Sequence, residues 1–395
     1  MSETKRRPVD LVMVLWGLLM AVALGLFLQH EFQLRQALLF FTGLGLGFAL
    51  LQGMFGFTGG WRKFIRERDS VGLRGQLLLV MLSAALFFPL VGGAIEGVQV
   101  SGAMGQVGIS LLVGAFLFGI GMQLGGGCGS GTLFTVGQGQ VDMLITLAFF
   151  IIGTTLGSAH LGWWLSLPNM GSVSLIEQWG WAPALLLSLA ALVMLYVVVR
   201  REEYRSSGAV HSLQNTERQG SLLEQLVYGP WPLWWAVIAL ATLGLATLLL
   251  AGYPWSITFG FGLWGSKIWA ALGGDPAGWA YWASGYPAKA LESSVLADAT
   301  SVMNFGIMLG ALLAAALAGK YAPAGRISRM RLVSAVAGGL LLGYGARLAF
   351  GCNIGALLGG IASGSLHGWL WMVMAFIGGI AGVKIRIWMK LDKPL

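Results

Sequence analysis

The amino-acid sequence predicts an all-α polytopic membrane protein with about ten transmembrane helices, additional short re-entrant helices and two inverted repeats. The first reason is composition: 56% of the 395 residues are hydrophobic and 10% are charged, whereas soluble domains carry about 25% charged residues. The second is that apolar stretches recur along the chain at the length of about 20 residues that a spanning helix needs. The third is an internal similarity around two cysteines. The alternating ~10-residue strands of a membrane barrel are not seen.

Ten apolar stretches qualify as membrane spans. They cover residues 11–28, 37–57, 75–95, 107–124, 143–165, 181–199, 232–251, 302–319, 332–350 and 367–387. Shorter apolar pieces at residues 255–271 and around Cys128 and Cys352 are too short or too rich in glycine to cross. Such segments are tolerated at membrane depth only where protein or a polar cavity covers their backbone. We therefore expect re-entrant or broken helices at these three places.

The distribution of basic residues predicts the orientation. With the N-terminus in the cytoplasm, twenty Lys and Arg residues fall in the inside segments and three in the outside segments, as the positive-inside rule requires. We therefore expect a multi-pass protein of the cell inner (plasma) membrane with both termini cytoplasmic. The net charge of +8 then belongs to loops beside lipid, and no nucleic-acid partner is expected. Residues 200–231 read as a cytoplasmic linker between a first transmembrane repeat (1–199) and a second (232–395).

The two halves of the chain resemble each other around two glycine-rich segments. Residues 119–133 read GIGMQLGGGCGSGTL and residues 343–357 read GYGARLAFGCNIGAL, so that seven positions are identical at an offset of 224, including the only two cysteines, Cys128 and Cys352. Past a one-residue shift, three further glycines pair: Gly139, Gly153 and Gly157 with Gly364, Gly378 and Gly382. Because five spans separate the two cysteines, the repeats must have opposite orientations. Inverted repeats with broken helices near the midplane are typical of transporters.

The glycines beside the cysteines, Gly127, Gly129 and Gly351, predict a close approach of the backbone to a ligand. Glycine adopts conformations that other residues resist, and a short helix starting after such a run favours an anion at its free N–H groups. The alternative, which we expect for most of the 61 glycines, is tight helix packing. A thiol adds a soft, weak S–H donor that suits a sulfur-bearing ligand. Two cysteines are too few for a disulfide framework or a structural zinc site, and neither a metal nor a cofactor is expected.

Arg347 lies inside an apolar span, five positions before Cys352. A central Arg costs at least about 2.5–3.5 kcal/mol on insertion scales, so such residues usually have a task. An anion partner is the functional interpretation, and snorkelling or pairing with a carbonyl is the alternative. Gln123 is the counterpart of Arg347 in the first half, so the two halves are not equivalent. Gln123 and Asn353 complete the predicted substrate-binding set with Arg347, the two cysteines and their three glycines.

The paired segments GMQLGGGCGSGTL and GARLAFGCNIGALL resemble the YeeE/YedE family of membrane proteins over most of the chain. The resemblance implies broken helices that meet at a narrow centre, uptake of thiosulfate or another sulfur or selenium species, and transfer of the ion between cysteines through S–H···S contacts. Cys128 and Cys352 match two of those cysteines. Many members carry a further cysteine in an R-x-x-F-C-x-x-G-x-x-R-D segment, whereas QGMFGFTGGWRKF here has Gly56 at the cysteine position and Lys63 at the acidic one. The resemblance also implies a small cytosolic sulfur-carrier protein as a partner.

These observations predict a permease for a small sulfur-containing anion, most of all thiosulfate, and not an enzyme. Two alternatives stay open: transport of another sulfur or selenium species, and a membrane-embedded sulfurtransferase that carries sulfur as a cysteine persulfide. A soft-metal exporter is disfavoured because clustered Cys or His ligands are missing from the sequence.

Overall fold

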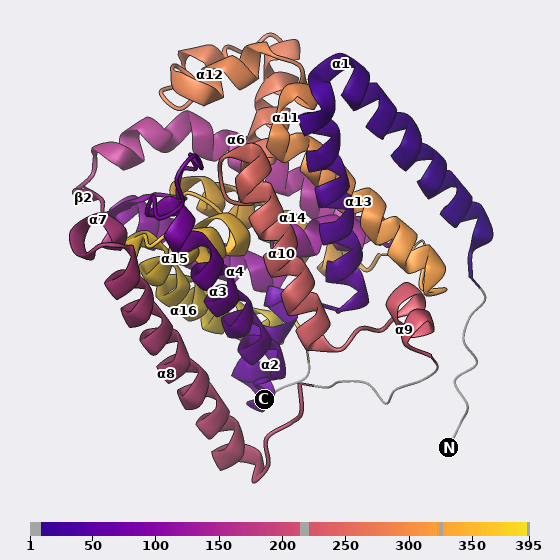
Figure 1. Cartoon of the computed structure of the whole chain (residues 1–395), viewed down its shortest axis with the longest axis vertical. Helices are drawn as coiled ribbons and strands as arrows, with labels where there is room; N and C mark the ends of the chain where they lie inside the picture. Colours follow the sequence, from indigo (N-terminus) through magenta and orange to yellow (C-terminus); the bar gives the residue numbers. More distant parts are fainter. Residues whose placement is uncertain (1–8, 214–220, 322, 324–326, 393–395) are drawn as a thin grey trace.

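The computed structural model of the protein describes residues 9–213, 221–321, 323 and 327–392. It is helical almost throughout (Figure 1), and in the described part of the chain the strands are β1 (Gln106–Gly108) and β2 (Asn169–Ser172), which pair antiparallel. The predicted class, an all-α polytopic membrane protein, is thereby confirmed. Six basic residues used for the predicted orientation lie outside the described residues: Lys5, Arg6, Arg7, Arg218, Arg326 and Lys393.

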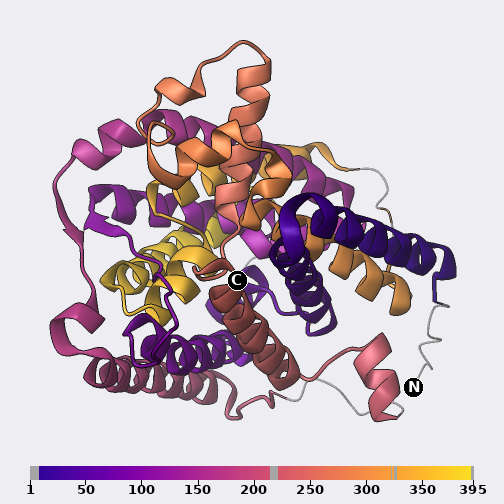
Figure 2. The same cartoon turned by 45° about the horizontal axis from the view of Figure 1, so that its top comes forward.

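Nine helical segments of the described chain are long and apolar enough to cross a membrane. The first contains α1 (Leu11–Gln52), which changes direction at Gln33, where φ is 74° and ψ is 164°. Its two legs turn back on one another in Figures 1 and 2. Each leg has the about 20 residues that a crossing needs, so the nine segments agree with ten predicted spans. The others contain α3 (Val71–Val91), α4 (Ile109–Gly125), α6 (Val141–Ser166), α8 (Trp181–Ser207), α10 (Leu233–Ala251), α13 (Ala299–Leu317), α14 (Arg329–Leu348) and α16 (Leu366–Trp388).

Short helices occupy the three places where the sequence predicts broken ones. α5 (Gly129–Gly137) begins after Cys128, and η3 (Asn353–Leu358) begins after Cys352 and continues as α15 (Gly359–Ala362). α11 (Thr258–Ala271) lies within the third piece. The remaining short helices are α2 (Phe57–Glu67), α7 (Leu175–Trp179), α9 (Leu222–Tyr228), η1 (Pro276–Gly278), α12 (Gly285–Glu292) and η2 (Val295–Ala297).

Helices of the first half of the chain pack mainly on helices of the second half. α1 lies against α13, α3 against α10, α6 against α14, and α4 against both α14 and α16. Glycine lets these backbones touch: a Cβ added to Gly343 in α14 would overlap the carbonyl oxygen of Phe150 in α6, and one added to Gly119 in α4 would overlap that of Ala375 in α16. Lipid is as apolar as a leucine side chain, so such close contact is a main source of helix association in membranes.

Aromatic rings fill the space between these helices, while aliphatic side chains cover the outside. The rings of Phe118 and Trp371 lie 5.2 Å apart, and those of Phe150 and Phe261 lie 4.9 Å apart; all four side chains are fully buried. On the first leg of α1, by contrast, Leu15 is 66% exposed. An apolar surface of this kind belongs against lipid chains. The centre of the molecule is therefore shielded from the bilayer.

Replacing Gly343 with leucine is expected to destabilise the protein. The new side chain would force α14 away from α6, and overpacking typically costs about 1–3 kcal/mol, occasionally more. The measurement is the thermal midpoint of the detergent-purified protein, which size-exclusion chromatography of heated samples monitors. Gly59→Ala is the matched control, because a Cβ at this helical glycine of α2 meets no atom within 4 Å. An unchanged midpoint in Gly343→Leu would contradict the packing argument.

Candidate functional site

Each cysteine caps the first turn of a short helix. Cys128 precedes α5, and its Sγ accepts the backbone N–H of Gly131 at 3.4 Å; Cys352 precedes η3, and its Sγ accepts the N–H of Ile354 at 3.4 Å. The backbone angles at the two cysteines nearly coincide, with φ of −88° and −103° and ψ of −166° and −168°. Both side chains are completely buried. Each sulfur thus lies at the N-terminal end of a short helix, where backbone N–H groups attract negative charge.

The turn before each cysteine uses the left-handed backbone conformation. Gly126 has φ of +79° and Phe350, at the same offset from Cys352, has φ of +61°. Glycine adopts this conformation freely, but for a bulky residue it is a strained one that tends to occur at functional sites. The geometry is therefore kept in the second half even though the glycine is not.

The two cysteine segments meet in the interior. A Cβ added to Gly129, the residue after Cys128, would lie 3.0 Å from the Sγ of Cys352 and 3.4 Å from a side-chain carbon of Ile257. Gly127 and Gly351 fold over the turns that follow them, since a Cβ would lie 3.0 Å from the N of Thr132 and 2.8 Å from the N of Ala356, respectively. All three predicted glycines are thus in close backbone contacts, and one of them touches the opposite thiol.

Unpaired polar side chains accompany the thiols. Asn353 is fully buried, and neither atom of its side-chain amide has a hydrogen-bond partner among the described residues. Asn304 of α13 donates to the carbonyl oxygen of Ile257 at 3.0 Å, and its own Oδ1 has no partner there. The Oγ of Ser130 lies 3.5 Å from the Sγ of Cys128. Buried polar groups are normally satisfied, so unpaired ones need an explanation.

Ser130 and Asn304 are absent from the set predicted from the sequence. Ser130 stands in the cysteine segment itself. Asn304 is a polar residue inside an apolar span, which is by itself a signal of function in a membrane protein. Either signal could have identified the residue.

Arg347 contacts different elements from the cysteines. Its guanidinium carbon lies 3.9 Å from the ring centroid of Tyr281 and 5.8 Å from that of Trp282, and its Nη2 is pressed against Gly262 of α11. The side chain is buried, and its Nε and Nη2 have no hydrogen-bond partner among the described residues. An aromatic face attracts the cation but leaves its N–H donors unused. Two of its nitrogens therefore have N–H groups without an acceptor among the described residues.

Gln123 lies among arginines. Its Oε1 accepts from the Nε of Arg62 at 3.0 Å, and its backbone oxygen accepts from Arg62 at 3.1 Å and from Arg386 at 2.9 Å. The position that carries an arginine in the second half therefore carries, in the first half, a glutamine bound by an arginine of α2. Among the described residues, neither Gln123 nor Arg347 forms a hydrogen bond with a cysteine. The predicted residues therefore form a central group around the two cysteines and two separate positions, Gln123 and Arg347.

Gly56 stands where the resemblance places a third cysteine. A Cβ at this position would have no atom within 4 Å. The adjoining helix, α2, starts at Phe57. The missing side chain therefore leaves open space at the start of α2.

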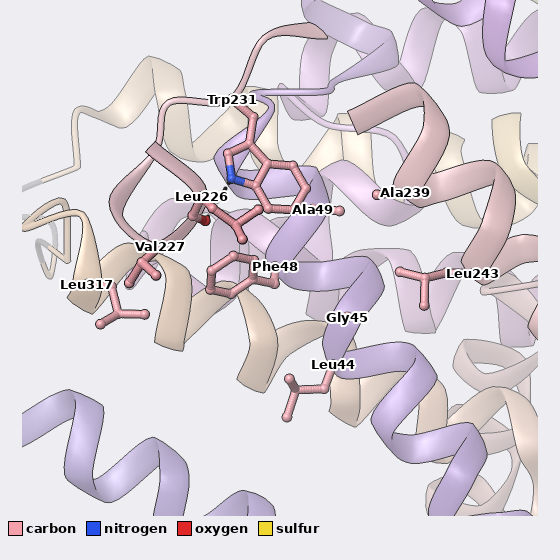
Figure 3. A pocket seen from close by; sticks show the side chains of 10 residues that line it. All are labelled: Leu44, Gly45, Phe48, Ala49, Leu226, Val227, Trp231, Ala239, Leu243 and Leu317. Atoms are coloured by element: carbon pink, nitrogen blue, oxygen red, sulfur yellow. Dashed lines mark hydrogen bonds between the residues drawn. The ribbon is translucent and has the colours of Figure 1, made fainter. Parts of the chain in front are cut away.

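An apolar cavity of about 430 Å³ lies between α1, α9 and α10 (Figure 3). Phe48, Leu226, Trp231 and Leu243 are among the residues that form its wall. No charged residue lines it, so it offers no partner for an anion. The donors that suit an anion lie instead at the buried cysteine segments, at Arg347 and at Gln123.

Comparison with known proteins places these features in context. Residues 52–381 match the family described as "Sulphur transport". The probable transporter YedE of Salmonella typhimurium is 35% identical over 152 residues, which cover 38% of this chain and 37% of that protein, so the match spans little more than a third of its length. The thiosulfate transporter TsuA of Spirochaeta thermophila is 27% identical over 85% of this chain and 96% of its own. TsuA of Escherichia coli is 24% identical over 89% and 94%.

The burial of both thiols predicts that neither reacts in the folded protein. A thiol reagent attacks only accessible thiolate, and both side chains have no exposed surface. A polar, membrane-impermeant thiol reagent should label no cysteine in the native detergent-solubilised protein and both cysteines after denaturation. Ser206→Cys, at an exposed position of α8, is the control and should react at once. Rapid native labelling of either natural cysteine would contradict the buried placement.

Proposed function

Because this chain belongs to the sulphur transport family, we propose that it is a permease for a small sulfur-containing anion, with thiosulfate as the leading substrate. The predicted resemblance to YeeE/YedE proteins is confirmed by these matches, and two relatives matched over most of their length are named thiosulfate transporters. The observation that carries the proposal is the contact of Gly129 with the Sγ of Cys352 in the buried interior. It brings the two cysteine segments within reach of one bound ion.

In the proposed path, the ion passes between the thiols of Cys128 and Cys352. A dianion loses much hydration energy when it leaves water, and the site must replace it. Each sulfur already accepts a backbone N–H, so its S–H proton is available to a ligand. The amide nitrogen of Asn353, which has no partner among the described residues, adds two further N–H donors. A soft S–H donor suits the terminal sulfur of thiosulfate, and amide N–H groups suit its oxygens.

An inverted repeat is supported by paired contacts. Gly121 of α4 approaches Gly338 and Leu342 of α14, and Gly345 of α14 approaches Gly114 and Phe118 of α4. Adding 224 to a residue number in α4 gives the equivalent residue in α14. Gly121, Gly114 and Phe118 then correspond to Gly345, Gly338 and Leu342, so the two sets of contacts are equivalent. The Gly119 contact with Ala375 of α16 corresponds in the same way to the Gly343 contact with Phe150 of α6, with the one-residue shift that makes the offset between α6 and α16 225. We therefore keep the division into a first repeat (1–199), a linker (200–231, of which 214–220 lie outside the described residues) and a second repeat (232–395).

In the proposed orientation, the ion enters from the outer side. The N-terminus and C-terminus are cytoplasmic in the cell inner membrane, so the C-terminal end of α14, which carries Arg347, faces outward. An anion that enters from outside then meets Arg347 and Cys352 before it reaches Cys128. A small cytosolic sulfur-carrier protein would receive the product on the other side. Uptake of labelled thiosulfate, sulfite, sulfate and selenite by cells that express the protein tests the substrate, and stable attachment of one sulfur atom to a cysteine would favour a sulfurtransferase instead.

Replacing either cysteine with alanine is expected to abolish thiosulfate uptake while protein levels stay normal. Each variant removes one of two donors that act in sequence, so neither thiol can replace the other. Uptake by proteoliposomes is the measurement. Ser188→Ala, which removes a buried hydroxyl that has no partner in the described chain, is the control and should transport normally. Wild-type rates in the double alanine variant would reduce both cysteines to packing residues.

Arg347→Gln should raise the KM for thiosulfate about ten- to hundredfold, because hydrogen bonds to charged groups contribute about 1.5–3 kcal/mol. Arg347→Lys should restore only part of this affinity, since an ammonium lacks the planar fork of guanidinium. Arg35→Gln is the control: Arg35 donates to the carbonyl oxygens of Leu250 and Ala251, and its loss should leave KM unchanged. An unaltered KM in Arg347→Gln would mean that Arg347 serves only the fold.

A further inference from the structure

Three arginines and one carboxylate form a cluster at the end of the bundle where α2 and the C-terminal end of α16 meet. Arg386 binds Asp392 through two hydrogen bonds, at 2.7 and 3.0 Å, and Arg66 lies 3.2 Å from the same carboxylate. Arg62 completes the cluster through Gln123. α2 packs against α16. We call Arg62, Arg66 and Arg386 the arginine cluster.

Within the described part of the chain, Asp392 is the carboxylate in contact with the arginine cluster, and the positive charges of all three guanidinium groups act on it. The hydrogen bond from Arg386, together with the charges of Arg386, Arg62 and Arg66, lowers the pKa of Asp392 below its ordinary value. The carboxylate is therefore ionised at neutral pH. The side chains of Arg66, Arg386 and Asp392 are only 16%, 14% and 13% exposed, so water screens their interaction less than at an open surface.

Capping of α4 explains only part of this arrangement. Arg62 and Arg386 both donate to the backbone oxygen of Gln123, near the C-terminal end of α4, where positive charge is favourable. Capping does not require the carboxylate. It also leaves the Nε2 of Gln123 buried without a partner among the described residues. That amide donor is an independent sign that an acceptor belongs in the cluster.

Asp392 holds the geometry of a bound oxyanion. An arginine that grips two oxygens side by side recognises carboxylates and tetrahedral oxyanions in the same way. α16 ends at Trp388, so Asp392 lies on a short segment beyond the helix. It can leave the arginines without unwinding α16. Gln123 lies five positions before Cys128, just as Arg347 lies five before Cys352.

We propose that the arginine cluster, with the amide of Gln123, is a second anion-binding site, which takes small divalent oxyanions such as thiosulfate or sulfate, and that Asp392 occupies it as a tethered competitor. The proposal rests on the transport function for its biological meaning, but the binding site stands on its own contacts. In the proposed orientation, this site faces the cytoplasm. An arriving anion displaces Asp392 from Arg386 and Arg66, and the carboxylate returns when the anion leaves.

The test is equilibrium binding of radiolabelled thiosulfate and sulfate to the purified full-length protein. The parent carries Arg347→Gln, so that the outer arginine does not contribute to binding. Adding Asp392→Asn should tighten binding about tenfold if the carboxylate fills the site about nine-tenths of the time, because occupancy by a competitor scales the apparent affinity. Asp392→Ala removes the same carboxylate without introducing an amide and should show the same gain.

Two further variants make the result specific. Arg386→Gln added to Asp392→Asn should remove the gain, and Arg386→Lys should keep part of it. Glu202→Gln is the matched control, because it also takes a carboxylate from an arginine, at an exposed pair with Arg205 (3.0 Å), and it should leave binding unchanged. Equal or weaker anion binding after loss of Asp392, in both the asparagine and the alanine variant, overturns the inference. A gain in binding alongside no transport of any sulfur anion by the unaltered protein would overturn the proposed function instead.

Discussion

Contact between the backbones of α4, α6, α14 and α16 is the constraint on which the centre of the protein depends. In lipid, burying apolar side chains gives little drive for helices to associate. The glycines at positions 119, 121, 343 and 345 allow the helices to touch. The loops that carry the cysteines emerge from these helices, so the separation of the helices fixes the separation of the loops. Gly129 can lie against Cys352 only while α4 and α14 stay at this distance.

Most of the fold could be predicted from the sequence because the bilayer leaves few choices. Backbone groups in hydrocarbon must be satisfied within a helix, so the length of an apolar run nearly decides its structure. The ten predicted spans and three broken segments correspond to helices. The turn inside α1 is different: the sequence suggests a loop between residues 28 and 37, whereas a break at Gln33 is enough to reverse the chain. Local conformation of one residue is not visible in hydropathy.

The parts of the candidate site whose residues are neighbours in the sequence could be predicted. The parts formed by contacts between residues far apart in the sequence could not. The cysteines and their glycines lie in two short segments, and the repeat identifies both. The neighbours of Arg347 and Gln123 come from distant elements: Tyr281 from the connection after α11, Arg62 from α2 and Arg386 from α16. In the sequence, Arg62 and Arg386 read only as charges that orient the protein. Their partners depend on tertiary contacts that no local pattern encodes.

The open space beside Gly56 bears on how such a protein can diverge. Most positions in a tightly packed interior resist change, because a new side chain needs compensating changes in its neighbours. Gly56 has no such neighbours within 4 Å of the added carbon. Lineages can therefore gain or lose a side chain there in a single mutational step, with little penalty in folding. Chemistry at the start of α2 can therefore change while the packing of the surrounding helices stays as it is.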